Sequence, residues 1–133
     1  MRALRSLALV AATALVASCG GGGGDGGGPE AGVLRLTLDT PNAGDGAILF
    51  RVTGEIDSIQ GGAMMQEGSY GEVSTYTRVV IAGNLVDGPV AYLFVSDVAD
   101  IATYVATVEQ VAVKATNAQR SLAGYSITVS EEP

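Results

Sequence analysis

Four oxygen-bearing side chains, Asp39, Asn42, Asp45 and Asp57, are the residues whose chemistry suits a bound cation. Calcium takes six to eight oxygen ligands, and an EF-hand loop supplies them from alternate positions. Here the first three follow one another at every third position instead. Asp and Asn next to Pro and Gly are also the usual residues of a tight turn. The sequence therefore favours a turn and leaves a weak Ca²⁺ site as the alternative.

Two further carboxylates, Asp97 and Asp100, lie close together in the sequence, and paired carboxylates can carry out acid–base chemistry of the kind found in glycosidases. Two acids in a loop after a strand are more typical of a turn. The chain contains no His, which removes the commonest general base. Neither Gly-x-Ser-x-Gly nor Ser-x-x-Lys occurs. We therefore expect a protein that is not an enzyme.

Tyrosines are the candidate sugar-binding platforms, because the chain has five Tyr and no Trp. Four of them lie in segments with the pattern of strands, where packing at the edge of a core is the usual role. Only Tyr70, between glycines, is expected in an exposed loop. A glycan-binding module is therefore kept as an alternative.

The segment Gln60–Glu72 is rich in glycine and contains the pair Met64-Met65. Methionine side chains are flexible and adapt to varied partners. Together with Tyr70, they make this segment the best candidate for contact with a partner protein. The alternative is a loop that folds its methionines over one end of the domain.

The first 18 residues have the pattern of an export signal. Arg2 and Arg5 precede an apolar run, Leu7–Val16, that is too short to span a bilayer as a helix. The run ends in Leu-Val-Ala-Ser-Cys, which resembles the lipobox of bacterial lipoproteins. The resemblance implies cleavage before Cys19 and acylation of this residue by diacylglycerol and a further chain such as palmitate. Each buried CH₂ would contribute roughly 0.8 kcal/mol to membrane binding.

Glycine makes up almost all of the next segment, from Gly20 to Gly28. Glycine has a large backbone entropy to lose, so such a tract is expected to stay unfolded. Nine flexible residues span roughly 15–18 Å. We therefore expect residues 19–31 to be a lipidated Cys19 and a disordered tether.

Acidic residues outnumber basic ones by 14 to 7, which gives a net charge of −7. Loss of Arg2 and Arg5 with the signal would leave five basic residues and a net charge of −9. Such a chain has no basic patch to neutralise phosphates, so nucleic acid is not expected as a partner.

Alternating apolar and polar residues predict strands through most of residues 32–130. The leucines of Gly32–Asp39 form one face, and Ile48, Phe50 and Val52 form another. Further strands are predicted at 74–82, 90–95 and 122–129, and Gly61–Glu72 is expected to be irregular. The turn spacing predicts an all-β fold, a single immunoglobulin-like antiparallel β-sandwich of about seven strands.

The segment 96–115 fits two structures. The spacing of Val98, Ile101, Val105, Val108 and Ala112 suits a helix. The many β-branched residues favour a strand from Thr103 to Val113 instead. That strand would place Val105, Val111 and Val113 on one face.

Two stretches resemble the cohesin-like and carbohydrate-binding-like sandwiches of bacterial surface proteins. They are Leu34–Gly54, with its Thr-Pro-Asn and Asp-Gly turn, and Gly83–Val129, with its Tyr-x-Ala-Thr-Val and Gly-Tyr-Ser-Ile-Thr-Val segments. The resemblance implies the sandwich class and carries no specific ligand motif.

Together these patterns lead us to expect a non-enzymatic lipoprotein of the cell envelope. A lipid on Cys19 would hold it to a membrane, on the periplasmic side of an outer membrane or at the cell surface. The tethered sandwich would serve adhesion, assembly or binding of an envelope protein or glycan.

Overall fold

The computed structural model describes residues 27–62, 66–73 and 76–133, and for 66–73 it describes the backbone alone. This part of the chain forms eight strands and one short 3₁₀ helix. Their bounds are β1 (Gly32–Asp39), β2 (Asp45–Thr53), β3 (Ser58–Gly61), β4 (Gln66–Val73), β5 (Tyr76–Leu85), β6 (Gly88–Val95), η1 (Ile101–Thr103), β7 (Ala106–Val113) and β8 (Ser126–Glu131).

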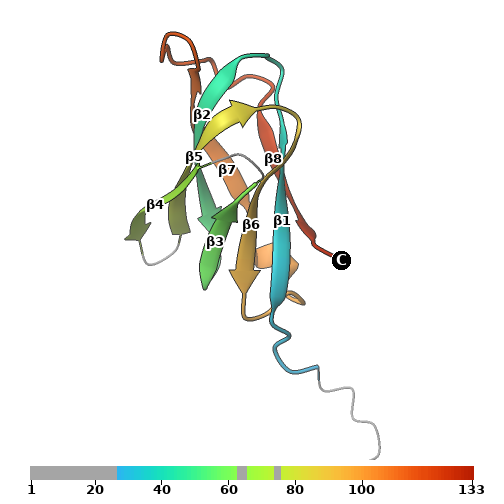
Figure 1. The fold of residues 1–133 in the computed structure, drawn as a ribbon. Helices are drawn as coiled ribbons and strands as arrows, with labels where there is room; N and C mark the ends of the chain where they lie inside the picture. Colours follow the sequence, from blue (N-terminus) through green and yellow to red (C-terminus); the bar gives the residue numbers. More distant parts are fainter. Residues whose placement is uncertain (1–26, 63–65, 74–75) are drawn as a thin grey trace, which may run out of the picture.

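The strands form two antiparallel sheets that pack face to face (Figure 1). One sheet has the order β3-β6-β1-β8 and the other the order β4-β5-β2-β7. The predicted antiparallel β-sandwich is confirmed. No helix in the described part of the chain is long and apolar enough to cross a membrane.

Side-chain alternation explains why β1 and β2 lie at the centre of the fold. Leu34, Leu36 and Leu38 are at most 1% exposed, whereas the residues between them are half-buried. Phe50 and its neighbours on the same face of β2 pack against these leucines in one core. The buried faces are those that the sequence predicts, because a period of two places every second side chain on the same side.

The strand β6 also follows its prediction. It lies between β3 and β1, so both of its edges are hydrogen-bonded. Val90, Ala91, Leu93 and Val95 are buried, while Phe94 on the outer face is 38% exposed. The apolar residues of the inner face therefore belong to the core, whereas Phe94 leaves an apolar side chain on the outer face.

Two expectations were wrong. The segment Gly61–Glu72 is not irregular throughout, because Gln66–Val73 forms β4, paired with β5. The second is the placement of Val105 on the same face as Val111. The strand preferred for this segment is confirmed as β7, which begins at Ala106 after the 3₁₀ turn η1. Its register with β2 shifts between Leu49 and Phe50, so Val111 is buried but Val105 is 53% exposed. A bulge of one extra residue reverses which side chains face the core.

Different loops and turns form the two ends of the sandwich (Figure 1). We call the end where the chain enters β1 at Gly32 the proximal end. It includes the loops 54–57 and 96–105. The opposite end, the distal end, is built from the turn 40–44, the turn 86–87 and the long connection 114–125.

Candidate functional site

A buried carboxylate organises the distal end. Asp45, the first residue of β2, is 0% exposed. Its Oδ2 accepts hydrogen bonds from the Tyr125 hydroxyl at 2.6 Å and the Thr40 hydroxyl at 3.0 Å. Its Oδ1 accepts one from Arg120 Nε at 3.0 Å, and Asn42 Nδ2 donates to the Tyr125 oxygen at 3.0 Å. The cluster ties the turn after β1 to the connection before β8.

Opposing effects set the pKa of the Asp45 carboxyl. Burial by itself raises the pKa of the Asp45 carboxyl, because a charge is costly to remove from water. The hydrogen bonds from Tyr125, Arg120 and Thr40, with the positive charge of Arg120, outweigh burial and hold the pKa below its ordinary value. Asp45 is therefore a carboxylate at neutral pH, and its oxygens are occupied by these donors.

The four residues considered for a cation do not form one site. Asp39 is exposed at the end of β1, and Asn42 and Asp45 belong to the distal cluster. Asp57 lies beyond the other end of β2, roughly 26 Å along the strand at about 3.3 Å per residue. In the described part of the chain, no three Asp, Glu, Cys or His residues are grouped to hold a metal ion. The structure therefore favours the tight turn over a Ca²⁺ site for these residues.

The second pair of acids, Asp97 and Asp100, belongs to the proximal end. Asp97 Oδ1 accepts hydrogen bonds from the backbone N–H groups of Ala99 at 3.0 Å and Glu30 at 3.3 Å. The Val98 N–H donates to the Glu30 carbonyl at 2.7 Å. Asp100 precedes η1 without capping it through its side chain. Asp97 therefore holds the segment that leads into β1, which is a structural role.

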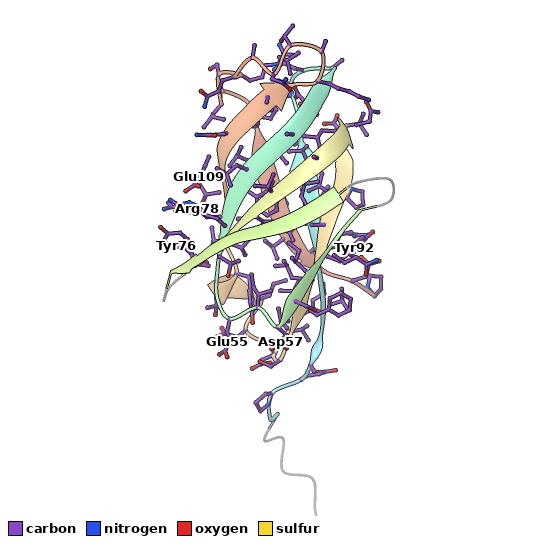
Figure 2. All side chains as sticks on the ribbon, turned by 60° about the vertical axis from the view of Figure 1, so that its left-hand side comes forward. Glu55, Asp57, Tyr76, Arg78, Tyr92 and Glu109 are labelled. Atoms are coloured by element: carbon purple, nitrogen blue, oxygen red, sulfur yellow. The ribbon has the colours of Figure 1, made fainter. Side chains whose placement is uncertain are left out.

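Tyr104 lies beside this acidic loop and is 7% exposed. Its hydroxyl donates to the Glu55 carbonyl at 3.0 Å. Burial, and next the negative charges of Asp97 and Asp100, raise the pKa of this phenol. Glu55 and Asp57 project from the same end (Figure 2). The proximal end is therefore acidic.

The outer face of the sheet β4-β5-β2-β7 carries a different cluster. The ring of Tyr76 is in contact with two guanidinium groups, with its centroid 5.2 Å from Arg78 Cζ and 5.7 Å from Arg51 Cζ. Arg78 Nε also donates to Glu109 Oε2 at 2.9 Å, and Figure 2 shows these two side chains projecting together. The hydrogen bond to Glu109 is the largest of the effects that raise the pKa of Arg78 above its ordinary value. Arg51 is exposed.

A shallow hollow of about 340 Å³ adjoins this cluster on the same sheet. Leu49 and Val80 are among the aliphatic residues that line it, and we call these two its floor. Gln110, Asn117 and Gln119 also line it, and we call these three amide residues its rim. The rim forms because the chain folds back after β7, with Gln119 bridging to Ala112. Asn117 adopts φ 58°, a left-handed conformation that Asn tolerates better than most residues.

Of the candidate partner segment, Tyr70 lies in β4 rather than in a loop, opposite Arg78 in register. Met64 and Met65 lie outside the described residues, as do Cys19 and the export signal.

Sequence reasoning missed the cluster of Arg51, Tyr76 and Arg78. Two arginines in two predicted strands of an acidic chain were the available signal, but their contact depends on which strands pair and in what register.

Comparison of the chain with family models, curated proteins and solved structures gives no match.

Proposed function

We propose that this chain is a non-enzymatic cell-envelope lipoprotein whose β-sandwich is a binding domain held to a membrane by a lipid on Cys19. The observation that carries the proposal is the sequence Leu-Val-Ala-Ser-Cys after a short apolar run, followed at once by glycines. A cysteine at this position, the only one in the chain, has an assignable chemical role as the acylated residue.

The geometry of the sandwich fits this arrangement. The chain reaches β1 through Glu30, which is hydrogen-bonded to Asp97 and Val98 at the proximal end. A lipid attached upstream would therefore place the proximal end toward the membrane. The distal end and both outer sheet faces would remain available to a partner.

Replacement of the acylated residue tests the proposal. Cys19→Ala removes the thiol, so we expect loss of labelling by a radioactive or clickable fatty acid and release of the protein from the membrane fraction. Ser18→Gly is the matched control, because it changes the neighbouring residue to one that is common at that lipobox position. This variant should keep both labelling and membrane association. Retention of Cys19→Ala in the membrane would refute the proposal.

A further inference from the structure

Two arginines face each other directly across neighbouring strands. Arg51 on β2 and Arg78 on β5 are paired in register. Like charges at such positions destabilise a sheet. Only five basic residues lie outside the first 18 residues, and two of them occupy this one pair. The Tyr76 ring and Glu109 offset part of the repulsion, since Glu109 neutralises Arg78. Arg51 is exposed, and its guanidinium contacts the Tyr76 ring but takes part in none of the ion pairs among the described side chains, so it is available to an anionic ligand.

The hollow beside this pair has an uncharged lining that combines aliphatic residues with three amides. Leu49 and Val80, also paired in register, are two positions along the strands from Arg51 and Arg78, which corresponds to roughly 7 Å. The floor of the hollow is therefore continuous with the arginine pair. Amide side chains at the rim donate and accept hydrogen bonds, as hydroxyl-rich ligands require.

The hollow itself offers few anchors to a protein partner. The side chains that dominate protein interfaces, chiefly Trp, Tyr and Arg, fill well-packed pockets from which water is excluded. Among the described side chains that line the hollow, Val80 is the large apolar residue that is substantially exposed, at 36%. The surface combines an aliphatic floor and three amides with an arginine pair in which Glu109 neutralises Arg78, so Arg51 supplies the remaining positive charge. That charge favours an anion, and the amides favour hydroxyl groups beside it.

We infer that the outer face around Arg51, Tyr76 and Arg78, with its adjoining hollow, binds a sugar chain that carries anionic groups. A carboxylate or phosphate of the chain is held by the exposed Arg51 guanidinium, and a neighbouring sugar lies on Leu49 and Val80 with its hydroxyls on the rim amides. This inference deepens the proposed function, because it names the chemistry of what the tethered domain binds.

Calorimetric titration of the full-length protein in detergent tests the inference. Galacturonate oligomers supply carboxylates, phosphorylated mannan oligomers supply phosphates, and neutral galactan oligomers supply neither. We expect one or both anionic glycans to bind more tightly than the neutral one, and more weakly at high salt. Arg51→Gln should lower the affinity about tenfold, as loss of a charge-assisted hydrogen bond does.

Arg35→Gln is the matched control. Arg35 lies on the other sheet and pairs with Glu132 at 3.4 Å, so the variant makes the same change in net charge away from the site. Its affinity should stay within about twofold of the parent's, since it removes no ligand contact. An equal loss in both variants would show a nonspecific charge effect and overturn the inference.

Three further measurements test the hollow, the need for a sugar and the independence of the site from the lipid anchor. Gln110→Ala changes no charge and should lower affinity about threefold through one lost hydrogen bond, even if Arg51→Gln fails to fold. Absence of glycan binding, or equal binding of poly-glutamate, overturns the inference. Cys19→Ala should bind the glycan as the parent does, so failure of the anchor and failure of the binding site are distinguished.

Discussion

Asp45 shows how a single residue can hold two distant parts of the chain together. The carboxylate is fully buried, which is costly for a charge unless it is paired and hydrogen-bonded. Its partners Arg120 and Tyr125 lie 75 and 80 residues away in sequence. Arg120 Nη2 also donates to the Ala43 carbonyl at 3.1 Å. The cluster therefore fixes the connection before β8 against the turn after β1.

Asp45→Asn should destabilise the fold by about 2–4 kcal/mol at neutral pH, because it leaves Arg120 without its anion. Arg120 is 29% exposed, so water screens part of the loss. In the parent protein the folded-state pKa of Asp45 lies below the ordinary value of 3.8. The ionised Asp45 carboxylate therefore stabilises the fold fully above pH 3.8. This stabilisation is lost as the pH falls from 3.8 through the lower pKa of the folded state. Urea unfolding measured from pH 7 down to pH 3 tests both effects.

The control for this experiment is Asp39→Asn, which removes a nearby exposed carboxylate. We expect it to change stability by less than about 0.5 kcal/mol. The Asp45→Asn variant should also show a flatter pH dependence than the parent. If the two variants were equally stable, Asp45 would not organise the distal end.

The sequence could single out Asp45 but not its role. Its neighbours Asn42 and Gly44 correctly predict a turn. The donors that complete the cluster come from the other end of the chain, and no local pattern connects them to Asp45. A long-range pair of this kind needs the sheet topology before it can be identified.

At the scale of the elements, Gly54 determines how β2 ends. It has φ +94°, a conformation that side chains other than glycine rarely adopt. A Cβ built there would lie 2.7 Å from Tyr104 Cδ1. The chain thus bends beside an aromatic ring whose hydroxyl holds the next residue, Glu55.

Gly54→Ala should therefore cost about 2–4 kcal/mol, through backbone strain and displacement of Tyr104. Gly44→Ala is the comparison, because Gly44 has φ +80° but open space around its Cβ position. Backbone strain alone should make that variant less stable by about 1–2 kcal/mol. Thermal unfolding of both proteins measures the difference, and equal losses would show that the contact with Tyr104 carries no cost.

The elements were predictable where alternation was strong. The leucines of β1 and the apolar face of β2 repeat every second residue, so their strands and buried faces follow directly. In contrast, β4 has the sequence Gln-Glu-Gly-Ser-Tyr-Gly-Glu-Val, whose glycines and charges have low strand propensity. It is paired through its backbone with β5, and a bulge interrupts the pairing. The bulge in β7 likewise leaves no mark in the sequence.

At the scale of the whole molecule, the proposed anchor gives the sandwich an orientation. Residue 121 lies in the connection at the distal end and residue 99 in the loop at the proximal end. A strand of eight residues between the two ends spans roughly 26 Å. The proximal end should therefore lie closer to the bilayer.

Dyes attached to Ser121→Cys and to Ala99→Cys should differ in energy transfer to an acceptor in the membrane. We expect stronger transfer from position 99, because the distal site is on average farther away, by up to roughly the 26 Å length of a strand when the domain stands upright on its flexible tether. Both substituted residues are exposed, so the fold should tolerate either. Equal transfer from the two sites would mean that the sandwich lies on its side or is not anchored upstream of β1.

The position of β1 also has a mechanical consequence. It is hydrogen-bonded to β6 on one edge and β8 on the other, and the chain enters it at its first residue. A pull on the chain at Gly32, directed away from the sandwich, acts along the strand and loads both ladders in shear. Their hydrogen bonds would share the load and yield together. By this geometry, the domain should resist tension on its tether better than a sheet that is peeled from an edge strand.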